Sequence, residues 1–307
     1  MKIRNALAAA MALALLGGAA PPAQDFNGAK FEINRDRVTY GTLKTCAKGT
    51  TYLVPTTYLY VTARTRLSAG GGLGKAKAKA RVFIEGLSRS ELQELSGQIT
   101  DAIVARLRAS GYTVLTWDDV KGDVADKERW PDNPRYGVPT HDARLFPGTD
   151  FAVAAPSDEQ ALSYGLMGPA ANFGKAAQRT GATLLLPEIY LTLPQLGGST
   201  SQTYSGTHAS ISFDPAMHLA GAYVYGATAK GGWCSINVPE HGVRTPAPFA
   251  GEFTELGVKE ETFGDEWSTK SGDYTFAVND AAFRTGVLAT GRSLASLIGD
   301  AMDGKTK

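Results

Sequence analysis

Two stretches of strict two-residue alternation, joined by a glycine-rich segment, constrain the fold of this 307-residue chain more than any other feature. From Tyr58 to Leu67, polar and basic residues alternate with residues suited to a buried face, and from Lys75 to Ile84 lysine alternates with alanine before the strand becomes apolar. A period of two is typical of β-strands. The intervening residues 68–74 include four glycines, which suit a flexible turn. The sequence therefore predicts a β-hairpin with a glycine-rich tip.

Other segments have the period of a helix. Residues 88–91 (Ser-Arg-Ser-Glu) have the form of a capping box, and apolar residues then recur at three- and four-residue steps until Gly111. A small-residue helix near 170–180 leads into an apolar strand at 182–191, and Asp280 is expected to cap a closing helix. With strands expected at 112–117, 209–213, 219–227 and 232–238, the pattern predicts an α+β fold: one sheet-centred domain with helices packed on it and a protruding β-hairpin.

This single domain is expected to span residues 51–303. Residues 24–50 contain few apolar side chains and are expected to form an extended N-terminal segment. Residues 118–156 and 239–273 lack a period and are rich in Asp, Pro, Gly or charge, which predicts two irregular insertions. A helix is expected to start near Ser157.

The composition excludes several classes of protein. With 43% hydrophobic and 20% charged residues, the chain is too apolar and too evenly charged to be disordered. Its 31 basic and 30 acidic residues give a formal net charge of +1. The chain therefore has neither the overall basic excess that would indicate a nucleic-acid partner nor an acidic tail.

The first 23 residues are typical of a secretory signal peptide that is removed. Lys2 and Arg4 precede an apolar run at 6–16 and small residues at 17–20, and the apolar run is shorter than the roughly 20 residues of a spanning helix. A retained anchor is the alternative. We therefore expect a periplasmic or outer-membrane-associated protein. Without Lys2 and Arg4, 29 basic residues face 30 acidic ones, a formal charge of −1.

Export favours a disulfide between the two cysteines, Cys46 and Cys234, which are 188 residues apart. Two separate buried thiols and a catalytic or metal role are the alternatives. Neither cysteine has the CxxC spacing that a zinc or redox site usually shows.

One side of the predicted hairpin is rich in positive charge. Across a strand spacing of about 5 Å, such side chains repel one another unless water or an anion receives them. A solvated face that protects an edge strand is one interpretation, and a binding face for an anionic envelope component or acidic partner protein is another. A third interpretation is a transmembrane hairpin, which would require a ring of subunits. The six residues are Arg64, Arg66, Lys75, Lys77, Lys79 and Arg81.

The sequence has no recognisable motif for catalysis, metal binding or cofactor binding. The Gly70–Lys75 loop lacks the first glycine and the Ser or Thr of a nucleotide-binding loop, and the chain has no G-x-S-x-G elbow. The acidic group at 118–126 lacks the ligand pattern of a calcium loop. No catalytic residue, metal or cofactor is therefore predicted. The four histidines, none in a metal-ligand spacing, are His141, His208, His218 and His241.

The element order resembles that of the CsgG-type family of curli secretion and of the related TolB amino-terminal domain. The resemblance rests on the hairpin, the long helix that ends in Gly-Tyr-Thr-Val-Leu at 111–115, the Thr-Gly-Ala-Thr-Leu-Leu-Leu junction at 180–186, the strand pair that follows and the closing helix. It implies an assembly or secretion component and no enzyme. Unlike that family, the chain has no cysteine at the expected cleavage site, and its hairpin precedes the first long helix.

The leading hypothesis is thus a non-catalytic exported envelope protein that acts by binding or assembly, as a secretion or scaffold component. Its expected partner is an envelope protein or an anionic envelope polymer, with no nucleic acid. Homo-oligomerisation and peripheral membrane contact are left open. One alternative is a periplasmic hydrolase whose site is built from loops 118–156 and 239–273 with His141 and His241. The other is a subunit of an oligomeric outer-membrane pore.

Overall fold

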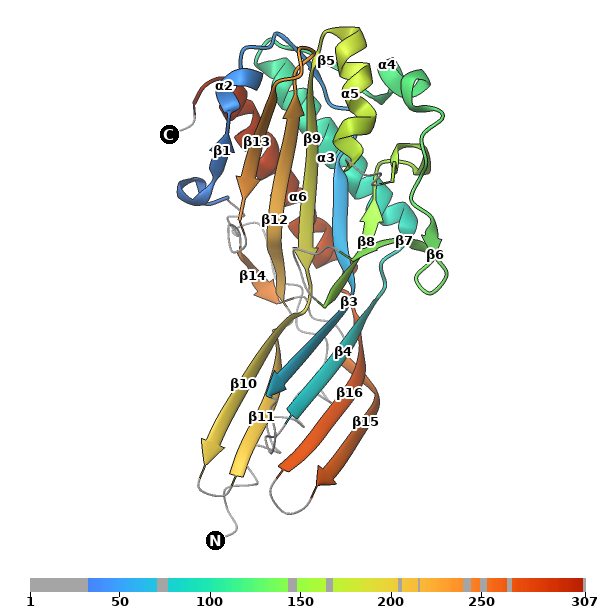
Figure 1. Ribbon diagram of the computed structural model, residues 1–307, viewed down its shortest axis with the longest axis vertical. Coiled ribbons are helices and arrows are strands. Elements are labelled where there is room, and N and C mark those ends of the chain that lie inside the picture. Colours follow the sequence, from blue (N-terminus) through green and yellow to red (C-terminus); the bar gives the residue numbers. More distant parts are fainter. Residues whose placement is uncertain are drawn as a thin grey trace.

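One large mixed sheet organises the molecule. The computed structural model describes residues 33–70, 77–142, 148–163, 168–203, 206–214, 216–239, 244–248, 253–263 and 267–305. The main path of the sheet follows the order β1-β13-β12-β9-β3-β4-β16-β15. Figure 1 shows helices around the upper part of this sheet, which we call the head, and strands extending below it. The strands are β1 (Thr39–Gly41), β2 (Thr51–Leu53), β3 (Tyr58–Gly70), β4 (Lys77–Glu85), β5 (Thr113–Leu115), β6 (Asp132–Asn133), β7 (Val138–Asp142), β8 (Thr149–Ala154), β9 (Thr183–Thr192), β10 (Gln195–Thr203), β11 (Gly206–Asp214), β12 (Ala216–Ala227), β13 (Trp233–Val238), β14 (Arg244–Pro248), β15 (Phe253–Phe263) and β16 (Trp267–Ala277).

The α+β fold class predicted from the sequence is therefore confirmed. We call the strand-built lower part the stalk: β10, β11, β15 and the distal parts of β3 (66–70), β4 (77–81) and β16 (267–273). The helices of the described residues are α2 (Leu43–Cys46), α3 (Arg89–Ala109), α4 (Trp117–Val120), α5 (Gly168–Thr180) and α6 (Asp280–Met302), with short 3-10 helices η2 (Arg35–Arg37), η3 (Lys121–Val124) and η4 (Asp158–Gln160).

The two longest helices, α3 and α6, cover one face of the head. They lie side by side and run in the same direction, because Ile99 meets Gly291 and, further along both helices, Arg106 pairs with Asp303. A Cβ at Gly291 would overlap the Ile99 side chain, so this close approach requires glycine. Their apolar stripes pack on alternate residues of the sheet and form one core. The central members are Leu59, Val61, Leu95, Ile99, Ile103, Leu185, Ile189, Phe283, Val287, Leu294 and Ile298.

Helix α5 and the 117–162 region cover the opposite face. Phe173, Ala176 and Ala177 of α5 pack on the residues of β3 and β9 that point away from α3 and α6. This second core contains Tyr58, Tyr60 and Tyr190, all at most 5% exposed. The alternation of β3 and β9 thus supplies two separate cores, one on each side of the sheet.

The stalk has a different construction. Hairpin β10–β11 forms its own two-stranded sheet and packs on β3 and β4 (Figure 1). The packing is close, since a Cβ at Gly198 of β10 would lie 3.0 Å from Cβ of Ala69 and 3.2 Å from Cδ2 of Leu67. Ala78 and Ala80 of β4 are buried on the same side. Small residues therefore hold the two stalk layers together.

A disulfide joins Cys46, at the end of α2, to Cys234 of β13, with their Cα atoms 6.0 Å apart. The pairing predicted from the two cysteines is confirmed. Both cysteines are buried in the core under α3 and α6. The bond therefore fixes the N-terminal side of the head to the outer strands of the sheet.

The prediction of an irregular insertion at 239–273 was wrong. This segment contains β14, β15 and most of β16, and β15 pairs antiparallel with β16 along its whole length. The charged residues of both strands, such as Glu255, Lys259 and Lys270, do not alternate regularly with apolar residues, so no apolar period reveals the strands.

The segment 118–156 is also more regular than expected. It contains η3 and strands β6, β7 and β8, and β8 pairs with β3 in the centre of the head. Its apolar run, residues 151–154, is too short to stand out among the surrounding Pro and Gly residues.

Three further expectations were wrong in detail. Near Ser157 the chain forms only the short helix η4, and Asn279, rather than Asp280, caps α6. Within 24–50, the described part contains η2, β1 and α2 instead of a purely extended segment. By contrast, Ser88 caps α3 as expected, with its side chain accepting a hydrogen bond from the Glu91 N–H. The expected signal peptide, residues 1–23, lies outside the described residues.

Candidate functional site

The register of β3 and β4 places basic side chains on one side of the stalk. Arg66 is directly opposite Arg81, Ser68 opposite Lys79, and Gly70 opposite Lys77. Arg64, opposite Phe83, begins the same row nearer the head. We call the side formed by these five basic residues the cationic face. The sixth candidate, Lys75, lies outside the described residues.

Two of the five cations have carboxylate partners. Arg81 forms a two-pronged ion pair with Asp273 of β16, with N–O distances of 2.7 and 2.6 Å, and these hydrogen bonds raise the pKa of Arg81 above its usual value. Arg64 pairs with Asp150 of β8, which is its cross-strand neighbour. Asp273 lies 192 residues after Arg81, and Asp150 lies 86 residues after Arg64, so spacing in the sequence could not reveal either pair.

The other three cations have no ion-pair partner among the side chains that the structure describes: Arg66, Lys77 and Lys79. Arg66 and Lys79 are exposed and Lys77 is partly exposed. Like charges opposite one another on a sheet are destabilising, and pairing only Arg81 leaves the charge of Arg66 without a counterion. The cationic face therefore carries positive charges that no described carboxylate side chain neutralises.

Two further cations extend this surface, and the sequence did not indicate them. Lys259 of β15 is exposed, and the register aligns it through Ser271 with Lys79. Arg135 lies over the ring of Phe83, with its guanidinium carbon 3.9 Å from the ring centroid. A cation over an aromatic ring at this distance is a favourable contact. Both join the face only through the tertiary fold.

The reverse side of the hairpin is covered. The small residues of β3 and β4 that alternate with the cations are buried by β10–β11, as at Ala69 and Ala78. This is the side that the transmembrane interpretation of the hairpin assigns to lipid. In this fold it faces protein. Among the helices described, none is long and apolar enough to cross a membrane.

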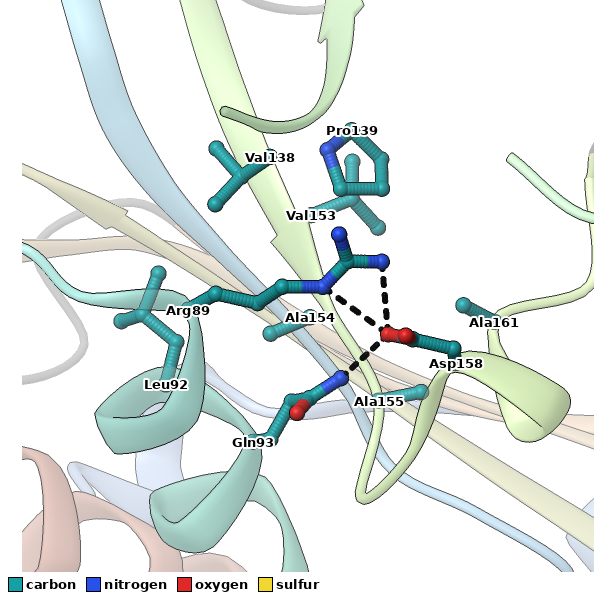
Figure 2. Close-up of a pocket in the computed structure, with 10 residues that line it drawn as sticks. All are labelled: Arg89, Leu92, Gln93, Val138, Pro139, Val153, Ala154, Ala155, Asp158 and Ala161. Atoms are coloured by element: carbon teal, nitrogen blue, oxygen red, sulfur yellow. Dashed lines mark hydrogen bonds and ion pairs between the residues drawn. The ribbon is translucent and has the colours of Figure 1, made fainter. Parts of the chain in front are cut away.

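A small surface hollow in the head lies between α3, β8 and η4 (Figure 2). Its polar residues bind one another: Arg89 pairs with Asp158 at 2.6 Å, and the Gln93 side-chain amide donates to the same carboxylate at 2.6 Å. Arg89 also pairs with Asp132 at 2.8 Å. The polar groups in the hollow thus serve to hold α3 against the 132–158 region.

Of the two histidines in the hydrolase hypothesis, only His141 lies in the part of the chain that the structure describes. The His141 ring lies 5.2 Å from that of Trp130 and 6.0 Å from that of Tyr60, as one member of an aromatic cluster. His218 is buried in β12, and His241 lies outside the described residues. Within those residues, no group of three or more His, Cys, Asp or Glu side chains is arranged to hold a metal ion.

The cationic face can bind anions chemically. Arginine presents a planar fork of donors to phosphate or carboxylate oxygens, and lysine presents a compact charge. Repeats of about 5 Å between strands and about 7 Å along a strand give the face a regular spacing that suits a polymer with repeated charges. No family model, characterised protein or solved structure matches this chain in the comparisons with known proteins.

Proposed function

We propose that this protein is a non-catalytic component of the cell envelope that binds an anionic envelope polymer, such as lipopolysaccharide phosphate or an acidic glycan, through the cationic face of its stalk. One observation carries the proposal. Arg66, Lys77 and Lys79 share one outward side of the stalk and have no ion-pair partner among the side chains that the structure describes, whereas Arg64 and Arg81 do.

The construction of the stalk supports a binding role. Its layers use small residues inside and leave long charged side chains outside. Unpaired like charges on neighbouring strands cost stability, so their presence is better explained by a ligand that neutralises them than by a contribution to folding.

The compartment and the finer fold are part of the same proposal. The Cys46–Cys234 disulfide is consistent with the periplasm or the outer-membrane surface, where disulfides persist. The order of hairpin β3–β4, helix α3, the α5–β9 unit, strands β12–β13 and helix α6 supports the resemblance to CsgG-type and TolB amino-terminal domains. On this view the head attaches the stalk to an envelope assembly.

Retention on immobilised lipopolysaccharide tests the binding role. The wild-type protein should be retained at low salt and released as ionic strength rises, because exposed charge contacts are screened. The triple variant Arg66→Gln, Lys77→Gln, Lys79→Gln should bind roughly tenfold more weakly or worse, since each exposed contact contributes about 0.5–1 kcal/mol.

A charge-matched control separates the face from net charge. Lys48, Lys175 and Lys230 are exposed cations of the head, and their replacement by Gln removes the same three charges. Retention should remain at the wild-type level in this control. Equal losses in both triple variants, or retention that does not change with salt, would refute the assignment of the cationic face.

A further inference from the structure

A second surface, on the head, gathers aromatic side chains that are exposed or partly exposed. Tyr223 and Tyr225 alternate along β12, and their rings are nearly parallel, at 17°, with centroids 6.3 Å apart. Trp233 of β13 is opposite Ala227, two residues beyond Tyr225 on the same side of the sheet. Trp233 is 55% exposed and Tyr225 is 37% exposed. We call these three residues the aromatic shelf.

The shelf lies where the helices stop covering the sheet. Helix α5 packs over β9 and β12, whereas β13 and the short β1 continue the sheet beyond it (Figure 1). The opposite side of the same strands is closed by the core under α3 and α6, which includes Val224 and Ile236. The shelf is therefore an open aromatic surface on strands whose other side is buried.

A buried carboxylate lies at the Tyr223 end of this shelf. Glu188 of β9 is only 1% exposed and is the cross-strand neighbour of Tyr223. The Tyr190 hydroxyl donates a hydrogen bond to its Oε2 at 3.1 Å, and the Tyr190 ring meets that of Tyr223 edge to face at 5.8 Å. The carboxylate is thus held in place by the same aromatic cluster that continues into the shelf.

The Glu188 carboxylate also acts on the shelf tyrosines. Burial raises the pKa of Tyr225 to about 12, and the charge of Glu188 adds to the rise. Burial and then the charge of Glu188 also raise the pKa of Tyr223. When Glu188 is ionised, the charge that disfavours a second anion at these hydroxyls favours a cation at the same place.

Aromatic faces together with a nearby carboxylate form the chemistry that recognises ammonium groups. We propose that the aromatic shelf binds a small, soluble organic cation with a quaternary or protonated ammonium group, which lies against the faces of Trp233 and Tyr225 and is attracted by Glu188. This site is on the head and is independent of the anion-binding function proposed for the stalk.

Choline and its neutral analogue 3,3-dimethylbutan-1-ol test this proposal, because the two have the same shape and differ in charge. Isothermal titration of the intact protein should show choline binding roughly tenfold more tightly than the neutral analogue. Equal affinity for both compounds, or no saturable binding of choline, would overturn the proposal.

Substitutions locate the site. Trp233→Leu and Tyr225→Leu keep an apolar side chain at exposed positions and should each weaken choline binding several-fold. Glu188→Gln should reduce the preference for choline over the neutral analogue; if this buried variant does not fold, the two exposed variants decide the question alone. The matched control is Leu256→Ala, which alters a 58% exposed side chain of the stalk and should leave choline binding unchanged.

Two other occupants of the shelf would appear in the same set of measurements. Saturable binding of neutral glucose oligomers that exceeds binding of choline would assign the shelf to carbohydrate and overturn the proposal. A concentration-dependent dimer in sedimentation equilibrium that Trp233→Leu abolishes would show that a second copy covers the shelf, which would also overturn it.

Discussion

The head and the stalk share strands β3, β4 and β16 but are stabilised in different ways. In the head these strands lie under helices and bury large side chains such as Leu59, Tyr60 and Phe276. In the stalk the same strands pack on β10–β11 through Ala69, Ala80 and Gly198. Little apolar area is available per residue in such small side chains, so the stalk depends on strands anchored in the head.

This difference indicates that the head and the stalk have different roles. In the head, long-range ion pairs join α3 to α6, as in the Arg106–Asp300 and Arg284–Glu94 contacts. Several cations of the stalk have no such partner among the described residues. The head therefore provides stability, and the stalk provides exposed surface.

The largest expected effect is a core substitution in the head. Phe283 of α6 is fully buried, and Phe283→Ala should reduce the free energy of unfolding by about 3–5 kcal/mol. Urea denaturation measures this loss, and stalk strands should unfold in the same transition because they continue head strands. Leu256→Ala, an exposed apolar truncation in the stalk, should change stability by less than about 0.5 kcal/mol. If the stalk stays folded after the head has unfolded, the dependence of stalk on head is wrong.

A smaller effect is expected from overpacking the stalk layers. Gly198→Val would push a side chain into Ala69 and Leu67 and should cost about 1–3 kcal/mol locally. Hydrogen exchange should show faster exchange in β10 and β11 with unchanged protection in α3. Equal acceleration in both regions would show that β10 and β11 cannot open while the head stays folded.

The acid sensitivity of the head should be of similar or smaller size. Burial favours the neutral form of Asp303, but hydrogen bonds from Arg106, Ser110, Lys305 and Tyr112 outweigh it and lower the pKa from 3.8 to about 2. Because the folded-state pKa is the lower one, this stabilisation is present above about pH 4 and is lost as the pH falls towards 2.

Asp303→Asn should therefore cost about 1–2 kcal/mol at pH 7 and flatten the pH dependence of stability between about pH 4 and pH 2. Thermal unfolding across that interval measures both. Wild-type and variant curves that stay parallel down to pH 2 would show that the carboxylate of Asp303 does not titrate as described.

The smallest effect should come from the cationic face, and with the opposite sign. Arg66→Glu replaces the repulsion between Arg66 and Arg81 with attraction, so it should stabilise the stalk by about 0.2–1 kcal/mol at low salt. The gain should shrink as salt is added. Retention on lipopolysaccharide should fall in the same variant. A loss of stability would show that Arg66 has a structural role that the contacts do not reveal.

Periodic segments of the head could be predicted from sequence because one face of each is buried. The stripe beginning at Leu92 and the apolar run at 183–191 correspond to α3 and β9. Strands β15 and β16 could not be predicted in the same way, since charged residues occupy both of their faces. Burial is the physical cause of periodicity, so elements with little burial leave little signal.

The candidate surfaces could also be predicted only in part from the sequence. The alternation of Lys77, Lys79 and Arg81 with alanine and valine indicated a shared side of one hairpin, and the register places them there. The pairing of Arg64 with Asp150 and of Arg81 with Asp273 depends on strands that are distant in the sequence. The contact between Glu188 and Tyr223 likewise depends on strand order. Such contacts arise from topology, and one sequence without its fold does not contain them.

The bond between Cys46 and Cys234 also closes a covalent ring. Both hairpins β3–β4 and β10–β11 belong to that ring, whereas β15, β16 and α6 lie outside it. A single protease cut in either enclosed hairpin therefore leaves two pieces joined by the disulfide, which separate only after reduction. A cut between β15 and β16 yields two pieces that only non-covalent packing holds together. In a compartment that contains proteases, hairpins β3–β4 and β10–β11 therefore stay covalently attached to the rest of the molecule after a single cut.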